Sequence, residues 1–233
     1  MPSLFLDNSW TARPQRPSLE LILRAKEGLL PGRGRLGILG GAYNPITRAH
    51  LILAKATLAQ FDLHEVIFVL SRMPPQKSLV GASIDQRLEM MRMSVANIPF
   101  ISIGLCSHGL LLDIALALQR VYPQDSDFFF ITGRDAAERI LTWPYDDPAE
   151  ALRKMFGAFQ LVVVERQGRF SLPRDPLIQQ YADRIHPLSL GENLDHVSST
   201  RVRQFIRAGK SCQDLLPAEA FAYIQKHRLY QNR

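Results

Sequence analysis

The sequence RLGILGGAYNPITRAHLILAKATLAQ, residues 35–60, holds an apolar run, a glycine-containing loop and a helical segment in that order. Residues 35–39 are apolar enough for a strand that is buried on both faces. The loop from residue 40 to 47 contains two glycines and an Asn-Pro pair, which are typical of a turn. Residues 48–60 have the length and composition of a helix. The stretch therefore predicts the first strand and helix of a βαβ unit.

The same alternation continues along the chain. Further strands are predicted at residues 65–70, 100–103, 127–132 and 160–165, with a weaker one at 184–188. Further helices are predicted at residues 83–97, 109–122, 199–208 and 217–227. Because apolar strands alternate with helices, we predict an α/β protein. Its doubly wound parallel sheet carries helices on both faces, and C-terminal helices close the chain.

The N-terminal residues differ from the rest. Residues 1–16 are rich in proline, arginine and small polar residues and are predicted to form an arm. Residues 17–30 have the pattern of a helix, with Pro17 near its first turn. We therefore predict an N-terminal arm and helix at residues 1–34, followed by one domain at residues 35–233.

The amino-acid composition limits the classes of protein to which the chain can belong. The 233 residues carry a net charge of +6, and 46% of them are hydrophobic. These values exclude a disordered or collagen-like chain. The two cysteines lie far apart, which is compatible with a reducing cytoplasm. There is no apolar run of about 18 residues and no signal-peptide pattern, so we expect a cytoplasmic protein with no membrane partner.

The basic residues gather at the two ends of the chain. Seven basic and two acidic side chains lie in residues 201–233, whereas residues 36–200 are slightly acidic. Many of the basic residues are arginines, which bind phosphate but can also reflect genome composition. No basic run interleaved with aromatic residues is present, so no nucleic-acid partner is expected.

Two glycine motifs do not fit their usual context. Residues 32–37 match G-x-G-x-x-G, but they precede the first strand instead of following it. Residues 209–211, Gly-Lys-Ser, resemble the end of a P-loop, yet position 204, where its first glycine belongs, is Gln204. Neither motif predicts a nucleotide site.

The loop after the first strand is the strongest candidate site. In a doubly wound sheet, ligands bind beyond the carboxyl ends of the strands. Gly40 and Gly41 allow close approach of a ligand to the backbone. Thr47 and His50 share one face of the first helical turn, whose free N–H groups attract anions. The pattern favours phosphate chemistry, although an ordinary corner with Thr47 as N-cap and His50 on the surface stays open.

Residues 40–50, GGAYNPITRAH, resemble the GxFxPxHxGH or TxGH signature of the nucleotidyltransferase superfamily. Six further segments resemble motifs of the nicotinate mononucleotide adenylyltransferases in the same order: residues 74–77 (PPQK), 87–91 (RLEMM), 132–135 (TGRD), 142–143 (TW), 197–203 (VSSTRVR) and the tail 216–230. The resemblance runs from about Arg35 to Tyr230 and implies a Rossmann-like nucleotidyltransferase fold over residues 35–233.

The resemblance implies an enzyme of NAD biosynthesis that transfers an adenylyl group from ATP to nicotinate or nicotinamide mononucleotide and releases pyrophosphate. Its partners would be these small molecules, with a homo-oligomer left open. Mg²⁺ would be held by phosphates and water, so no metal-ligating residues are expected. Two alternatives remain: transfer to another phosphorylated acceptor, and a catalytically silent nucleotide-binding protein.

The resemblance also implies the site residues. His50, Thr47 and Arg203 are the predicted catalytic residues, because they would contact the phosphates. The predicted nucleotide-binding residues are Gly40, Gly41, Ala42, Tyr43, Lys77, Gly133, Asp135, Trp143, Ser199 and Thr200. Among these, Trp143 would stack on the base of the mononucleotide, and Asp135 with Gly133 would face the nucleotide.

Three positions depart from the family pattern. The first histidine of HxGH is Thr47, and its glycine is Ala49. Residues 109–114 are GLLLDI where the family has SYTVDT, so only Asp113 is retained. The hydroxyl groups that would contact the nicotinate ring are absent there, which leaves the identity of the acceptor open.

Overall fold

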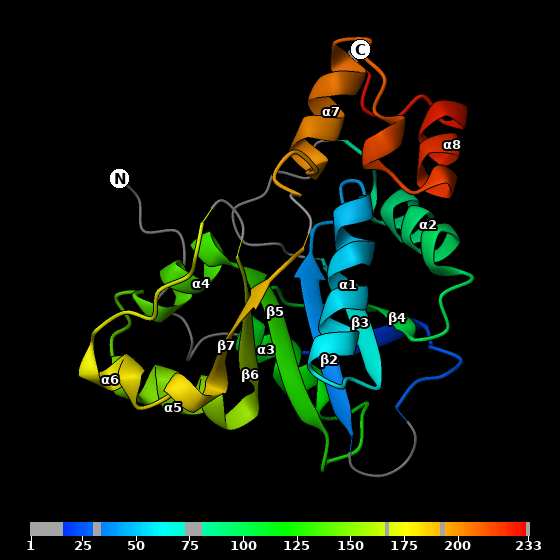
Figure 1. Cartoon of the computed structure of the whole chain (residues 1–233). Helices are drawn as coiled ribbons and strands as arrows, with labels where there is room; N and C mark the ends of the chain where they lie inside the picture. Colours follow the sequence, from blue (N-terminus) through cyan, green and yellow to red (C-terminus); the bar gives the residue numbers. More distant parts are fainter. Residues whose placement is uncertain (1–15, 30–33, 73–80, 166–167, 192–193, 232–233) are drawn as a thin grey trace.

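The computed structural model describes residues 16–29, 34–72, 81–165, 168–191 and 194–231 (Figure 1). Its centre is a seven-stranded sheet with the order β1-β4-β3-β2-β5-β6-β7. The strands are β1 (Leu19–Leu23), β2 (Arg35–Gly41), β3 (Glu65–Ser71), β4 (Ile101–Cys106), β5 (Asp127–Gly133), β6 (Gln160–Glu165) and β7 (Ile185–Ser189). All neighbouring pairs are parallel except β1 with β4. The predicted doubly wound α/β fold is therefore confirmed.

Helices cover both faces of the sheet (Figure 1). They are α1 (Arg48–Gln60), α2 (Ile84–Val95), α3 (Leu111–Leu118), α4 (Arg134–Leu141), α5 (Pro148–Ala158), α6 (Pro176–Gln179), α7 (Ser199–Arg207) and α8 (Ala218–Lys226). Successive strand residues enter opposite cores, because side chains alternate along a strand. Ile38 lies in the core under α3 and α5, and Leu39 lies in the core under α1 and α2.

The sheet has its switch point between β2 and β5. The chain runs from β2 to β3 and β4 on one side, and then returns to β5, β6 and β7 on the other side. The carboxyl ends of β2 and β5 therefore diverge into loops that leave in opposite directions. In doubly wound sheets this is where ligands bind.

The prediction of a helix at residues 17–30 is wrong. The structure has strand β1 there, paired antiparallel with β4 so that Leu19 lies opposite Cys106. The side chains of Leu19 and Leu21 pack on one core and those of Ile22 and Leu23 on the other. The free edge of β4 supplies the backbone partners, and local sequence cannot reveal such a tertiary contact.

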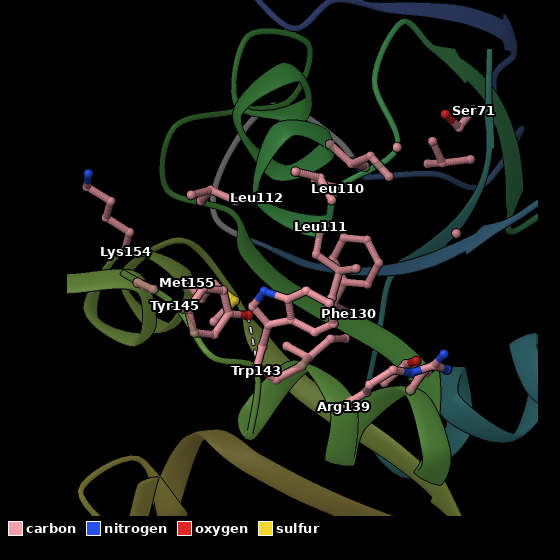
Figure 2. Close-up of a pocket in the computed structure, with 18 of the residues that line it drawn as sticks. Ser71, Leu110, Leu111, Leu112, Phe130, Arg139, Trp143, Tyr145, Lys154 and Met155 are labelled. Atoms are coloured by element: carbon pink, nitrogen blue, oxygen red, sulfur yellow. Dashed lines mark hydrogen bonds between the residues drawn. The ribbon is translucent and has the colours of Figure 1, made fainter. Parts of the chain in front are cut away.

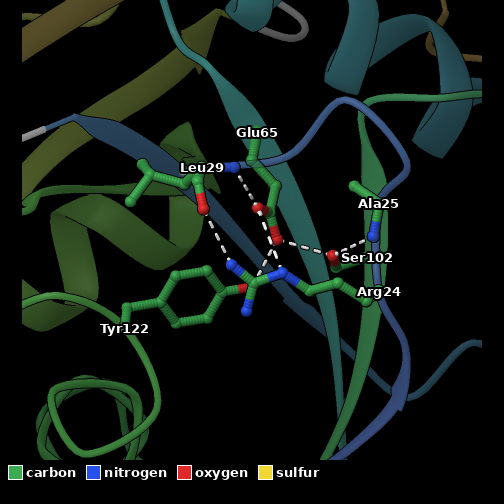
Figure 3. A network of polar contacts seen from close by, with 6 residues as sticks. All are labelled: Arg24, Ala25, Leu29, Glu65, Ser102 and Tyr122. Carbon is green, nitrogen blue, oxygen red and sulfur yellow. Dashed lines mark hydrogen bonds and ion pairs between the residues drawn. The ribbon is translucent and has the colours of Figure 1, made fainter. Parts of the chain in front are cut away.

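The carboxylate of Glu65 fastens this N-terminal segment to the sheet (Figure 3). Glu65 is completely buried and accepts hydrogen bonds from the Leu29 N–H at 2.7 Å, from the Ser102 hydroxyl at 2.5 Å and from the Tyr122 hydroxyl. Arg24 Nε lies 3.9 Å from the same carboxylate. A buried carboxylate is tolerated when it is satisfied in this way.

Several other boundaries differ from the predicted ones. The helix predicted at residues 109–122 is shorter, Leu111–Leu118, and the strand predicted at 100–103 continues to Cys106. Helices α4, α5 and α6 were not predicted. The capping box of Ser83 and Gln86 at the start of α2 is confirmed. In the described parts of the chain, no helix is both long and apolar enough to cross a membrane.

Candidate active site

Two pockets open beyond the carboxyl ends of the strands and share the loop Gly40, Gly41 and Ala42. We call them the polar pocket, a cavity of about 630 Å³, and the apolar pocket, a cavity of about 480 Å³. Thr132 at the end of β5 also lines both. The two cavities therefore meet at the switch point of the sheet, where the sequence predicts ligand binding.

His50 lines the polar pocket and is oriented by Thr47. The Thr47 N–H donates to His50 Nδ1 at 3.0 Å, and Thr47 Oγ1 lies 2.8 Å from the same nitrogen. A backbone N–H can only donate, so Nδ1 must accept. In a neutral ring the proton is then on Nε2. His50 can thus offer an N–H donor to a ligand, and it is no ordinary surface histidine.

Thr47 lies behind His50 and does not face the pocket. Its side chain is completely buried at the N-cap of α1. The sequence predicts that Thr47 donates to a phosphate, whereas in the structure its hydroxyl lies 2.8 Å from His50 Nδ1 and Thr47 is not part of the lining of the polar pocket. Thr47 is better described as the residue that holds the ring.

The start of α7 forms the opposite wall of the polar pocket. The Ser199 hydroxyl donates to the Pro45 carbonyl at 2.7 Å. Arg203 donates through Nη1 to the Asn44 carbonyl at 2.7 Å and through Nη2 to Thr200 Oγ1 at 3.3 Å. The bonds to Pro45 and Asn44 join two segments that are about 150 positions apart in the chain, and the bond to Thr200 holds the guanidinium beside the first turn of α7. Both features attract anions.

The polar pocket is cationic. Arg87, Arg203 and Arg207 line it, and the described residues around it include no aspartate or glutamate. The motif RLEMM contains Arg87, but nothing in the motif itself predicts that its guanidinium lines the pocket. Arg207 follows Arg203 by one helical turn, and that spacing is the signal that could have predicted it.

The apolar pocket has an aromatic wall (Figure 2). Trp143 and Tyr145 follow α4, and Leu110, Leu111 and Leu112 at the start of α3 line the same cavity. The Tyr145 hydroxyl donates to the Ile140 carbonyl at 2.9 Å, and burial raises the pKa of Tyr145 to about 12. Tyr145 is therefore a neutral phenol whose donor is already used. The cavity suits a flat, apolar-faced ring.

The structure brings together most of the predicted binding residues. Gly40, Gly41, Ala42, Tyr43, Gly133, Ser199 and Thr200 line the polar pocket, and Trp143 lines the apolar one. Tyr43 is nevertheless mostly a core residue, since its ring is buried and its hydroxyl donates to the Leu39 carbonyl. These positions show proximity to a cavity, and their binding roles stay predictions.

Two predicted residues are not placed at a pocket. The Asp135 side chain is 78% exposed and lies 3.3 Å from Arg134, outside both described cavities. The prediction that it faces the nucleotide is therefore not supported by its position here. Lys77 lies outside the described residues.

The chain is similar to known nucleotidyltransferases. The cytidylyltransferase-like family matches residues 38–205, so the chain belongs to that family of nucleotide-transferring enzymes. A probable nicotinate-nucleotide adenylyltransferase of Geotalea daltonii is 34% identical, and the match covers 85% of this chain and 99% of that protein. A protein of the same name from Gloeobacter violaceus is 31% identical, with 84% and 96% covered. Within the larger family, the chain belongs to the nicotinate-nucleotide adenylyltransferases.

Solved structures show the same fold. The Plasmodium falciparum nicotinic acid mononucleotide adenylyltransferase complexed with NaAD superposes with a TM-score of 0.63 at 21% identity. The match covers 84% of this chain and 97% of that structure. At this identity the comparison supports the arrangement of the sheet and helices, independently of the sequence relatives.

Proposed function

We propose that this enzyme transfers the adenylyl group of ATP to nicotinate mononucleotide, in NAD biosynthesis. The observation that supports this best is the pair of pockets that share the segment Gly40–Ala42, where β2 ends and the following loop begins. The polar pocket offers arginines, a helix N-terminus and His50 to a triphosphate. The apolar pocket offers Trp143 to the pyridine ring of the acceptor. Two substrates bound in this way meet at the loop.

The reaction needs no covalent enzyme intermediate. An oxygen of the mononucleotide phosphate attacks the α-phosphorus of ATP and forms a new P–O bond. The bond from that phosphorus to the bridging oxygen breaks, and pyrophosphate leaves with the electron pair. The nucleophile is already an anion, so no base is required. The enzyme must hold anions together and stabilise the charge of the transition state.

The residues of the polar pocket can meet this demand. His50, with its proton on Nε2, would donate to the α-phosphate or to the bridging oxygen. Thr47 would keep the imidazole in that orientation through its two contacts with Nδ1. Arg203 and the N–H groups at Ser199 and Thr200 would bind the β- and γ-phosphates. None of these contacts requires a proton transfer.

Mg²⁺ would arrive as part of the nucleotide substrate. The described residues include no group of three or more histidine, cysteine, aspartate or glutamate side chains placed to hold a metal ion. The described lining of the polar pocket likewise carries no carboxylate. Phosphate oxygens and water satisfy the octahedral preference of Mg²⁺ in such sites. The ion would reduce repulsion between the triphosphate and the acceptor.

A different phosphorylated acceptor is the second candidate. The observation that favours it is the apolar segment Leu110–Leu112, which lines the acceptor pocket without a side-chain hydroxyl. Pyrophosphate release from ATP, measured with a panel of mononucleotides, tests both candidates. We expect release with nicotinate mononucleotide. Release only with another acceptor supports the second candidate, and release with none supports a catalytically silent protein.

The apolar acceptor pocket predicts weak discrimination between the acid and the amide. Large specificity ratios arise when a polar group of the site would be left unpaired by the wrong substrate. Since the segment at residues 110–112 provides only backbone donors, we expect kcat/KM for nicotinate mononucleotide to exceed that for the amide by less than about 10²-fold. Steady-state assays with both mononucleotides measure the ratio. A far larger preference for the acid would show that other groups, such as Arg139 or Lys154 in the pocket lining, bind the carboxylate.

Replacing Trp143 by alanine tests the acceptor side. We expect KM for the mononucleotide to rise about 30-fold, because aromatic stacking and apolar contact each contribute about 1 kcal/mol, about 2 kcal/mol together. KM for ATP should change less than threefold. Trp143→Phe is the matched control and should keep most of the affinity. Equal increases in both KM values would place Trp143 outside the acceptor site.

A further inference from the structure

Arg87 is a buried cation at the wall of the polar pocket. It lies in the first turn of α2, and only 1% of its surface is exposed. Its Nε donates to the Ala82 carbonyl at 2.8 Å, and its Nη1 donates to the Ala42 carbonyl at 3.4 Å. The side chain therefore spans from α2 to the loop that the two pockets share.

The charge of Arg87 is not compensated by an anionic side chain among the described residues. In the described parts of the chain no carboxylate pairs with it, and its buried Nη2 has no hydrogen-bond partner. Burial lowers the pKa of the Arg87 guanidinium, and the nearby Arg203 adds to this effect while Tyr230 opposes it. The Tyr230 hydroxyl is also buried without a partner, and burial raises its pKa, so it is a neutral phenol.

An unpaired buried charge is costly, and a protein keeps it only when something else needs it. A purely structural residue in this place would be better as an apolar side chain of similar size. The polar pocket beside Arg87 contains two further arginines and no carboxylate among its described residues. The missing negative charge can therefore come from a bound polyphosphate.

We propose that Arg87 is a positioning residue for the polyphosphate of ATP. Its buried charge attracts the phosphates through a medium of low dielectric constant, where electrostatic interactions are strong. Its bond to Ala42, together with the bond from Arg203 to Asn44, also engages two carbonyl oxygens of the loop. Because both carbonyl oxygens accept these hydrogen bonds, their partial negative charges repel the phosphates of the substrate less. The inference rests on the proposed function only in assigning ATP to the polar pocket.

The test combines stability and binding of the full chain. Arg87→Met removes the charge and keeps the size, and Arg87→Lys keeps the charge but removes the planar fork. Arg92→Met is the matched control on the same helix, since Arg92 is exposed and pairs with Glu89. Thermal melting is measured for the free protein. Dissociation constants are measured for ATP and for inorganic triphosphate, without acceptor.

We expect Arg87→Met to weaken the binding of ATP and of triphosphate about tenfold or more, as loss of a charged interaction does. The free protein should melt close to the wild-type temperature, because removal of the buried charge offsets the loss of the hydrogen bonds to Ala82 and Ala42. Arg87→Lys should recover most of the affinity, and Arg92→Met should change neither measurement.

The opposite pattern overturns the proposal. A lower melting temperature of Arg87→Met with unchanged affinity for ATP would show that Arg87 only holds the two loops together. Unchanged melting and unchanged affinity would also reject it. Because binding is measured without the acceptor, a failure of the proposed adenylyl transfer to nicotinate mononucleotide would not be confused with either result.

Discussion

Replacing His50 by alanine is expected to lower kcat about 10²-fold or more, since loss of one transition-state hydrogen-bond donor typically has that effect. The geometry gives the reason. Thr47 holds Nδ1 as an acceptor, so the donor that faces the polar pocket is Nε2. Because charge develops on the α-phosphate as pyrophosphate leaves, this donor would act mostly in the transition state. KM for ATP should therefore change less than kcat.

The matched control is His64→Ala. His64 also accepts a backbone N–H at Nδ1, from Arg35 at 3.2 Å, but it precedes β3 and so lies at the amino-terminal ends of the parallel strands, whereas the pockets lie beyond their carboxyl ends. Steady-state kinetics and circular dichroism are measured for both variants. His64→Ala should keep its turnover. A His50→Ala enzyme with near wild-type kcat would show that His50 is not catalytic, and parallel losses in both variants would indicate a general loss of folded protein.

Replacing Arg203 by alanine is expected to raise KM for ATP by about 10- to 100-fold, the range for loss of a charge-assisted hydrogen bond. KM for the mononucleotide should rise much less. Arg203 contacts Asn44 and Thr200 at the wall of the polar pocket, where the triphosphate would bind. The apolar pocket, which would receive the acceptor ring, does not include it.

Arg201→Ala controls for the loss of a positive charge near the start of α7. Arg201 is exposed, and its guanidinium lies 5.2 Å from the centre of the Phe205 ring. The Arg201→Ala substitution should change neither the KM for ATP nor the KM for the mononucleotide appreciably. Steady-state kinetics with each substrate varied in turn measure the difference. Equal increases for ATP and mononucleotide in Arg203→Ala would contradict a dedicated contact with the triphosphate.

The parallel part of the sheet is predictable because most of its strands are largely apolar runs, whereas β7, with the sequence IHPLS, is predicted only as a weaker strand. Residues 65–70 are an example of such an apolar run, since the whole of β3 is buried and no alternation is needed there. Strand β1 was predicted as a helix because its stability comes from pairing with β4, which lies more than 70 residues away. Helices α4 and α5 are not predicted because both are short, 8 and 11 residues, although Asp147 and Pro148 at the start of α5 are typical of a helix N-terminus.

The site residues likewise differ in whether local sequence or tertiary contacts determine their position. His50, Arg203 and the glycine loop follow from short motifs, because a loop and a helix start are local features. Arg87 is not predicted as a site residue because its role depends on tertiary surroundings, namely the carbonyls of Ala82 and Ala42 and a described pocket lining without a carboxylate. Thr47 is predicted to contact a phosphate because the sequence alone does not show where its hydroxyl points. In the structure the first turn of α1 directs it toward Nδ1 of His50.

The position of β1 in the sheet has a consequence for how the chain acquires its structure. This strand is synthesised before the other described strands, yet it cannot pair until β4 has been made, as the bond between Ser18 and Ser107 across 89 positions illustrates. The carboxylate of Glu65 likewise stays incompletely satisfied until the residues near 102 and 122 have been made. Contacts of such long sequence separation form slowly, because closing the intervening loop costs entropy. The N-terminal strand is thus expected to dock last, onto a sheet whose central strands have already paired.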